Sequence, residues 1–163
     1  MNPYAKFLGD RNPLEALSDS PARIGALVES WRPDVFARSY AQGKWDARQI
    51  LIHLAHVEMA LGYRARQALT ISSYQVTPFD QDAWLAKDPS LDGPSAYRAY
   101  RGLRELNLAL FRNLSAEDRA RTFSHPQYGT QPVTWIIETL AGHDINHLGQ
   151  LQTIANEPVG AGR

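Results

Sequence analysis

Apolar residues recur at helical spacing over four long stretches of the chain, and this periodicity limits the possible folds more than any other feature. Within each stretch they fall three or four residues apart, so they form one stripe along a helix, and no convincing strand alternation appears. The stretches cover about residues 20–33, 46–69, 95–114 and 132–156. In a chain of 163 residues they predict an all-α four-helix bundle, a single domain over residues 1–163.

Capping residues predict where the first two long helices begin. Ser20 is followed by Pro21, which is the preferred order of N-cap and first helical residue, and the preceding "NPLEAL" predicts a separate short helical turn. Asp46 precedes the second stretch, and Gln49 follows three residues later, in the arrangement of a capping box. We therefore expect the first long helix to begin at Ser20 and the second at about Asp46.

The connections between the helices differ in length. Residues 70–95 contain three prolines and form a connection long enough to cross the length of the bundle, so the order of the helices around the bundle stays open. The segment "HPQYG" predicts a turn, and Pro132 is placed as the first residue of the last helix. Pro158 and Gly160 are expected to end the fold.

Composition excludes several classes of function. The chain has no cysteine, which excludes a disulfide, a catalytic thiolate of its own and a cysteine-based zinc site. The 17 basic and 17 acidic residues give zero formal net charge, so a nucleic-acid partner is not expected. No apolar run approaches the roughly 18 residues of a membrane span, and the N-terminus lacks a secretory pattern, so we expect a cytoplasmic protein without a membrane partner.

Two histidines interrupt the apolar stripe of the last helix. His143 and His147 lie four residues apart, so their imidazoles face the same side of the helix, where one metal ion can bind both. The second helix carries His53 among its buried apolar residues, and His56 lies further round, nearer the edge. We expect His53, His143 and His147 to be the metal ligands, with His56 as the substitute for His53.

Three histidine ligands leave one coordination position open, as in catalytic rather than structural metal sites. Glu58 and Asp144 are the nearest candidates for a fourth ligand or, like His56, for groups that support the ligands from behind. A fourth protein ligand would instead indicate a non-catalytic bundle, a binding or stress-response protein with a structural metal.

Three further interpretations concern one short motif and two single residues. "HDINH" can be compared with the His-Glu-x-x-His motif of metalloproteases, with Asp144 as general base, but the base is one methylene shorter and the mixed strand-and-helix architecture is missing. Asn107 on the third stripe is expected to fix the register of the helices rather than to serve the metal site. Arg64 could meet an anionic group, although a surface arginine is the more common explanation.

Four segments resemble the DinB/YfiT-like superfamily, in the same order and over nearly the whole chain. They are "KWDARQILIHLAHVE", "FDQDAW", "FSHPQYG" and "TLAGHDINHLGQL". The resemblance implies a four-helix bundle that holds a divalent metal, zinc first and nickel second, with His53 from the second helix and His143 and His147 from the last. It also implies a homodimer. Pro132 departs from the family pattern, because relatives often carry a threonine there.

The same resemblance implies two kinds of chemistry on a small-molecule substrate. Some members transfer a low-molecular-weight thiol to an electrophile, and others are described as metal-dependent hydrolases. A metal with an open position suits both, because it can activate either a thiol or a water molecule. The absence of cysteine is compatible with a thiol co-substrate that supplies the sulfur.

Overall fold

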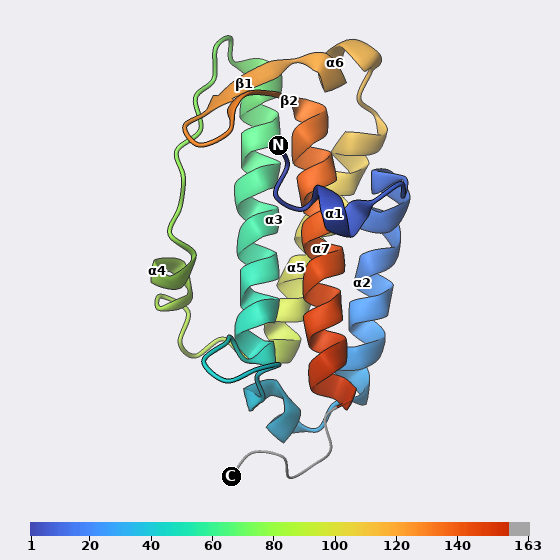
Figure 1. The fold of residues 1–163 in the computed structure, drawn as a ribbon, viewed down its shortest axis with the longest axis vertical. Coiled ribbons are helices and arrows are strands. Elements are labelled where there is room, and N and C mark those ends of the chain that lie inside the picture. The colour runs from blue at the N-terminus through green and yellow to red at the C-terminus, as the bar shows by residue number, and fades with distance from the viewer. Residues whose placement is uncertain (157–163) are drawn as a thin grey trace.

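The computed structural model describes residues 1–156 and shows four long helices packed side by side (Figure 1). The all-α four-helix bundle expected from the sequence is therefore confirmed. The four helices are α2 (Pro13–Ser30), α3 (Ala47–Thr70), α5 (Gly93–Arg112) and α7 (Val133–Asn156). Shorter helical segments lie at the ends and the side of the bundle: α1 (Ala5–Leu8), η1 (Pro33–Ala37), α4 (Gln81–Leu85) and α6 (Ala116–Ala120).

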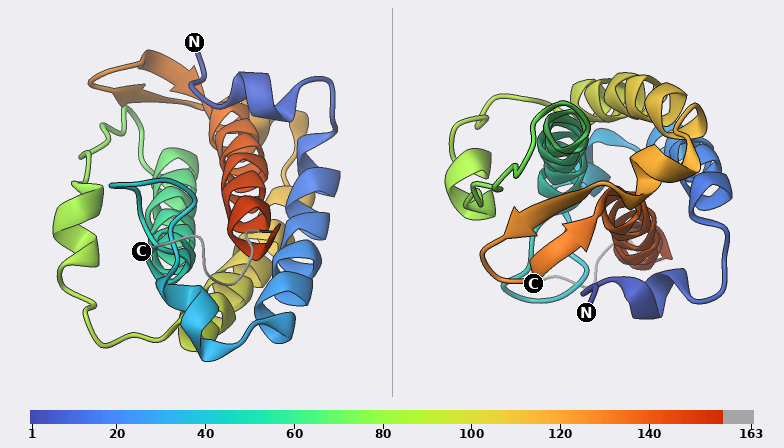
Figure 2. Two further views of the ribbon diagram at one scale, coloured as in Figure 1. Left: turned by 60° about the horizontal axis from the view of Figure 1, so that its bottom comes forward. Right: turned by 90° about the horizontal axis from the view of Figure 1, so that it is seen from above.

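The order of the helices around the bundle differs from their order in the chain. Helix α3 packs against α5 and α7, and α2 packs against the same two helices, so α2 and α3 occupy opposite corners. The view from above in Figure 2 shows these four corners. Helices α3 and α5 run upward in Figure 1, and α2 and α7 run downward. The connection over residues 71–92 must therefore return along the whole bundle, as its length predicts.

The first long helix begins earlier than the sequence predicts. The expected start at Ser20 is wrong, because α2 is continuous from Pro13 and contains Pro21 in its interior. The cap is Asn12, whose side-chain oxygen accepts hydrogen bonds from the backbone N–H groups of the second and third helical residues. Pro13 occupies the first helical position. An N-cap residue followed by proline therefore does mark the helix start, but at Asn12 and Pro13, eight residues before Ser20 and Pro21.

The interior proline is tolerated because another helix satisfies the carbonyl that it leaves free. Pro21 has no N–H to donate to the carbonyl of Leu17, four residues before it. The Arg104 guanidinium of α5 donates to that carbonyl through Nη1 at 3.1 Å. The Tyr97 hydroxyl, also on α5, donates to the Pro21 carbonyl oxygen at 3.0 Å. Tertiary contacts thus permit a helix that local sequence alone would divide.

The predicted starts of α3 and α7 agree with the structure to within one residue. The Asp46 side chain accepts from the Gln49 backbone N–H at 2.7 Å, and the Gln49 side chain accepts from the Asp46 backbone N–H at 3.0 Å. The capping box before α3 is therefore confirmed. Helix α7 begins at Val133, so the expectation that Pro132 is its first residue is wrong by one residue: Pro132 ends β2, opposite Thr122. The predicted end at Pro158 and Gly160 lies outside the described residues.

A short β-hairpin at one end of the bundle was not expected. Strands β1 (Thr122–His125) and β2 (Gly129–Pro132) are antiparallel, with His125 opposite Gly129. The turn expected at "HPQYG" joins them, and Gly129 has a positive φ of 70°. Gln75 of the long connection pairs with Ser124 of β1. Strands of four residues are too short to show a clear period in a sequence window.

A layer of polar side chains crosses the middle of the bundle and separates two apolar clusters. One cluster contains Val57 and later residues of α3 with the part of α7 up to Ala141, and the other contains the earlier part of α3 with Leu148 and later residues of α7. The polar layer lies between these two apolar clusters. It is made by the buried side chains of His53, His56, Glu58, Arg104, Asn107, His143, Asp144 and His147.

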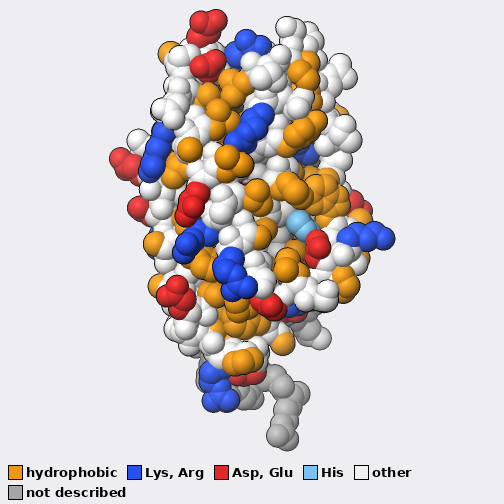
Figure 3. Space-filling view, turned by 180° about the vertical axis from the view of Figure 1, so that it is seen from behind, with side chains coloured by type: hydrophobic (Ala, Val, Ile, Leu, Met, Phe, Trp, Pro, Cys, Tyr) orange, Lys and Arg blue, Asp and Glu red, His pale blue; other side chains and the backbone are white. Residues whose placement is uncertain are grey.

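Charged side chains of both signs are interspersed on the rear face of the bundle (Figure 3). This mixture agrees with the balanced composition of the chain. Within residues 1–156, no helix combines the length and the apolar character needed to cross a membrane.

Candidate metal centre

Three histidines from two antiparallel helices meet inside the polar layer. His53 comes from α3, and His143 and His147 come from successive turns of α7. One ring nitrogen from each residue lies within 4.8 Å of the others. His53 Nε2 is 2.9 Å from His143 Nε2, and the three ring centroids are 4.4–5.0 Å apart. The structure thus brings together the three residues that the sequence selects, and we call them the histidine cluster.

The three imidazoles are neutral near pH 7. Burial, with smaller contributions from the neighbouring His147 and His56, lowers the pKa of His53 to about 3. Burial also lowers the pKa of His147 to about 4, although Gln150 and Asp144 oppose the shift. The pKa of His143 is well below its usual value for the same reason, burial first and its two histidine neighbours second. Neutral imidazole is the form that binds a metal ion.

The unpaired nitrogens of the cluster fit a metal better than they fit a hydrogen-bonded core. His53 Nδ1 and His143 Nδ1 are buried and have no hydrogen-bond partner. Without a metal, the close contact between their Nε2 atoms can satisfy only one N–H, which leaves polar groups of both rings unpaired. Such groups cost about 1–3 kcal/mol each. Three neutral nitrogens that converge on one point instead match the ligand set of a divalent ion.

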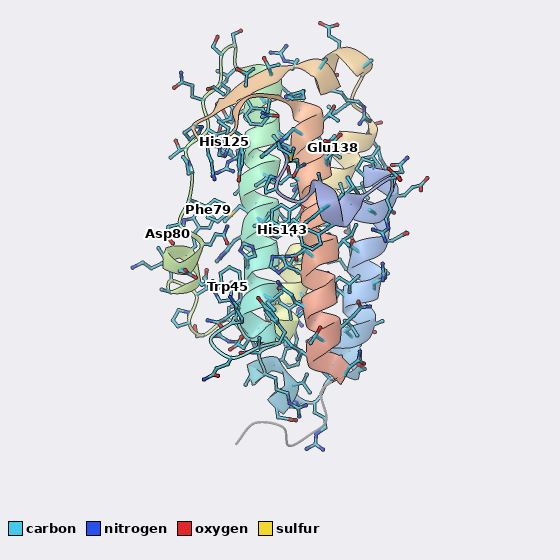
Figure 4. All side chains as sticks on the ribbon, in the orientation of Figure 1. Trp45, Phe79, Asp80, His125, Glu138 and His143 are labelled. Carbon is cyan, nitrogen blue, oxygen red and sulfur yellow. The ribbon has the colours of Figure 1, made fainter. Side chains whose placement is uncertain are left out.

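Side chains around the cluster fix the orientation of its rings. His147 Nδ1 lies 2.8 Å from Gln150 Oε1, so Nδ1 carries the proton and Nε2 is free to act as a ligand. The Trp45 ring packs 4.7 Å from His53 and stacks on His147 at 6.5 Å, measured between ring centroids. Trp45 Nε1 donates to Asp82 Oδ1 at 3.1 Å, which ties the loop before α3 to α4. Trp45 therefore covers the cluster from below in Figure 4.

The N-terminal segment covers another part of the cluster. The Tyr4 ring meets the His143 ring edge-on, with centroids 5.0 Å apart. Gly142 permits this approach, because a Cβ at that position would lie 2.4 Å from the Tyr4 carbonyl oxygen. A glycine immediately before the first histidine of α7 is therefore required by close backbone packing.

The three remaining polar candidates lie beside the cluster without bonding to it. His56 Nε2 is 2.8 Å from Asp88 Oδ2, so this histidine joins α3 to the long connection rather than to the other histidines. Glu58 and Asp144 both accept hydrogen bonds from Arg104. Among residues 1–156, the group of side chains able to share one metal ion contains only the three histidines. No fourth ligand comes from His56, Glu58 or Asp144 in this arrangement.

A buried arginine holds the two carboxylates. Arg104 is 1% exposed and makes ion pairs with Glu58 of α3 and, at 2.7 Å, with Asp144 of α7. The Tyr100 hydroxyl also donates to Asp144 at 2.7 Å, and the Asn107 amide donates to Glu58 Oε2 at 2.9 Å. Burial opposes the charge of Arg104, but Asp144 and the other partners outweigh it and raise the pKa of Arg104 well above its usual value. Asn107 thus bonds to Glu58 and not to the histidine cluster, and its role in helix register stays a prediction.

A pocket of about 220 Å³ opens beside His143, between α3, α7, the hairpin and the long connection. A water molecule takes about 30 Å³ of liquid volume, so the pocket has room for a small organic molecule. Figure 4 shows His125 and Phe79 on the outer side of this region and His143 at its inner end. Its walls are mainly aromatic and aliphatic, with Tyr4, Tyr128 and Trp135 among them.

Sequence reasoning missed several residues around the cluster. Trp45 and Phe79 lie in segments that the sequence could place only as loops, and His125 lies in the unexpected hairpin. Arg104 follows Tyr100 by four residues and precedes Asn107 by three, so three polar groups share one face of α5. That spacing could have indicated a buried polar group on α5, but charged residues on a helix are usually exposed.

Comparisons with known proteins agree with this geometry. A model of the DinB superfamily matches residues 16–151. A "putative metal-dependent hydrolase" of Oceanobacillus iheyensis is 29% identical over 131 residues, which are 80% of this chain and 76% of the relative. YfiT of Bacillus subtilis, which carries the same description, is 32% identical over 117 residues, or 69% of this chain and 65% of the relative.

Solved structures share the fold. The structure of YfiT, described as having an unusual four-helix bundle topology, superposes with a TM-score of 0.80 and 23% identity over 87% of this chain and 83% of that one. A mycothiol-dependent maleylpyruvate isomerase gives a TM-score of 0.68 and 18% identity over 85% of this chain, which spans only 59% of the isomerase. The family model covers most of the chain, and the chain therefore belongs to the DinB superfamily.

Proposed function

We propose that His53, His143 and His147 bind one divalent metal ion, zinc in the first place and nickel in the second, and that the protein is a metal-dependent enzyme acting on a small molecule. The observation that carries the proposal is the convergence of three buried, neutral imidazoles beside a pocket. The description of relatives as metal-dependent hydrolases supports it. A divalent ion at this site would lower the pKa of a water molecule or a thiol and so supply a nucleophile at neutral pH.

The chain's own residues would position the reactants. Gln150 holds the His147 ring in one tautomer, and Trp45 and Tyr4 restrict access of bulk water to the histidines. The pocket beside His143 would hold the substrate. Glu58 and Asp144 are engaged by Arg104, and neither carboxylate bonds to the histidine cluster, where a general base would be needed. This disfavours a metalloprotease-like role for Asp144.

Metal analysis of the purified protein tests the ligand assignment. We expect about one divalent ion per chain, and little metal in a His143→Ala, His147→Ala double variant. His56→Ala is the matched control, because it removes an imidazole of the same layer that pairs with Asp88 instead. Full metal occupancy in the double variant, or loss of metal in the His56 variant alone, would contradict the assignment.

The reaction itself is either hydrolysis or transfer of a low-molecular-weight thiol, and one screen distinguishes them. The chain has no cysteine, so any sulfur nucleophile must come from a co-substrate. The structural similarity to a mycothiol-dependent isomerase favours testing thiols such as mycothiol and bacillithiol. The metal-loaded protein is incubated with electrophiles, with and without each thiol. Product formation that requires the thiol identifies a transferase, and product formation in its absence identifies a hydrolase.

A non-catalytic bundle with a structural metal is the second candidate. It would require the metal to maintain the fold, whereas here each long helix buries apolar residues in both clusters. Removal of the metal with a chelator should therefore leave the helical circular dichroism signal in place. The proposal also includes a homodimer in the cytoplasm without a nucleic-acid partner. Sedimentation of the purified protein tests the dimer.

A further inference from the structure

The pocket beside the histidine cluster is lined by hydrogen-bond donors but by no acidic side chain. Its described lining contains Arg64 and His125 and no aspartate or glutamate. Glu138 lies on α7 next to Thr139, a lining residue, but is not part of the lining itself (Figure 4). The remaining lining residues are Pro3, Tyr4, Val57, Leu61, Pro78, Phe79, Gln81, Gln127, Tyr128, Trp135, Thr139 and His143.

Arg64 brings a positive charge to this pocket without a counter-charge. Its Nη2 donates to the Thr77 carbonyl at 2.9 Å, and its guanidinium lies 5.6 Å from the centre of the Phe79 ring. Across residues 1–156, no carboxylate forms an ion pair with Arg64. Arg64 is half-buried, and this burial lowers its pKa. A charge in such a place is stabilised when an anion binds beside it.

A neutral histidine adds a second donor to the polar part of the pocket. The backbone N–H of Gln127 donates to His125 Nδ1 at 3.2 Å, so the neutral ring carries its proton on Nε2. Trp135 is 8% exposed, and its Nε1 is buried without a hydrogen-bond partner. This N–H is closed off from the pocket space, so Trp135 contributes its ring to the wall of the pocket. The Trp135 and His125 rings pack together with centroids 6.0 Å apart.

We propose that the pocket binds the carboxylate of a small organic substrate through Arg64, with the Nε2–H group of His125 as a further donor. The aromatic and aliphatic walls would hold an apolar body between this carboxylate and the histidine cluster. The planar guanidinium matches the two oxygens of a carboxylate, and phenyl phosphate is the competing ligand in the test below. The role of the molecule as a substrate rests on the proposed function, but its binding does not.

The position of Arg64 is fixed by the fold rather than by chance. Val76 N donates to the Ser124 carbonyl at 2.9 Å, and this pairing attaches the long connection to β1. Thr77 follows immediately and accepts the hydrogen bond of Arg64, while His125 follows Ser124 in the hairpin. The same pairing therefore places Arg64 and His125 on the same pocket. A surface arginine free to extend into solvent would have no such attachment.

Binding of benzoate and of its neutral analogue benzamide to the purified full-length protein tests the proposal. Calorimetric or ligand-observed NMR titration gives the two dissociation constants. We expect benzoate to bind at least about tenfold more tightly than benzamide, the factor that corresponds to about 1.4 kcal/mol. Arg64→Gln should abolish the preference, and Arg64→Lys should retain part of it. Arg101→Gln is the matched control, because it removes one exposed positive charge from α5 outside the pocket.

The same titration after chelation separates this proposal from the metal site. Benzoate preference that persists without metal and depends on Arg64 supports the carboxylate pocket, even if metal analysis contradicts the proposed function. Benzoate preference that is unchanged in Arg64→Gln and disappears on chelation would show that the carboxylate binds the metal, and would overturn the proposal. Equal affinities for benzoate and benzamide, or tighter binding of phenyl phosphate than of benzoate, would overturn it as well.

Discussion

Replacing Arg104 with leucine should destabilise the protein more than most single substitutions. The change strands Glu58 and Asp144 inside the bundle, where breaking a buried ion pair costs about 3–5 kcal/mol. It also leaves the Leu17 carbonyl without a donor, because Pro21 has no N–H, and this adds about 1–3 kcal/mol. The expected loss is therefore at least about 4 kcal/mol, a large part of the roughly 5–15 kcal/mol that stabilises a typical domain.

Urea unfolding followed by circular dichroism measures this loss. With a slope of about 2 kcal/mol per M, the unfolding midpoint of Arg104→Leu should fall by about 2 M. Arg101→Leu, on the same helix but with an exposed side chain, should change the free energy of unfolding by no more than about 0.5 kcal/mol. A loss below about 1 kcal/mol in Arg104→Leu would refute the reasoning, because the carboxylates would then have another source of stabilisation.

The pH dependence of the variant gives a second check with a definite sign. Burial raises the pKa of Glu58 in the folded state, and without Arg104 to oppose this effect the pKa rises further, so the folded protein binds more protons than the unfolded chain. The loss of stability in Arg104→Leu relative to the wild type should therefore be smallest below about pH 4, near the unfolded pKa of Glu58, and should grow as the pH rises through the raised folded pKa. The difference from the wild type should be larger at pH 8 than at pH 5.

A double-mutant cycle isolates the link between Arg104 and the interior proline. Pro21→Ala restores a backbone N–H that can donate to the Leu17 carbonyl. The restored N–H should add little stability when Arg104 already donates to that carbonyl, and more when Arg104 is absent. We expect the gain from Pro21→Ala to be about 1 kcal/mol larger in the Arg104→Leu background. Equal gains in both backgrounds would show that the carbonyl is satisfied in another way.

Three further predictions concern the histidine cluster. Gly142→Ala should lower the free energy of unfolding in urea by about 1–3 kcal/mol, because the new Cβ would clash with the Tyr4 carbonyl oxygen. Gly149→Ala is the control: its Cβ would have no neighbour within 4 Å, so this change should be neutral or stabilising. The metal-free protein should lose stability as the pH falls from about 6.5 toward 4, because the folded pKa values of His53 and His147 lie below those of the unfolded chain; a flat unfolding midpoint would contradict this. Chelation should remove the metal but not the helical circular dichroism signal, and cooperative unfolding on chelation would identify a structural metal.

The histidine cluster could be predicted because its signal is local. A separation of four residues places His143 and His147 on one face of a helix, whatever the rest of the chain does. The apolar neighbours of His53 indicate that this ring is buried, and a bundle has few places where buried faces of two helices can meet. Periodicity therefore predicts both the fold and the three residues, without giving the order of the helices around the bundle.

The remaining parts of the site depend on contacts between segments far apart in the chain. Arg104 is buried only because its carboxylate partners lie on two other helices. Pro21 remains inside a helix only because Arg104 is present, so the local signal for a helix start at Ser20 is overridden. Trp45 and His125 reach the site from a loop and a hairpin, whose positions follow from tertiary contacts such as the bond from Trp45 to α4. No pattern within a single segment carries this information.

The polar layer links the stability of the bundle to the geometry of the histidine cluster. Arg104 binds Glu58 of α3 and Asp144 of α7, which are the two helices that carry the histidines. Asp144 adjoins His143 in the chain, so the ion pair sets the height of α7 relative to α3 at the level of the cluster. A shift of α7 by one turn would move its histidines about 5.4 Å and separate their nitrogens from that of His53. Apolar packing alone tolerates such a shift better than the ion pairs of Arg104 with Glu58 and Asp144 do. This specificity accounts for buried charges next to the histidines, even though burying them costs free energy.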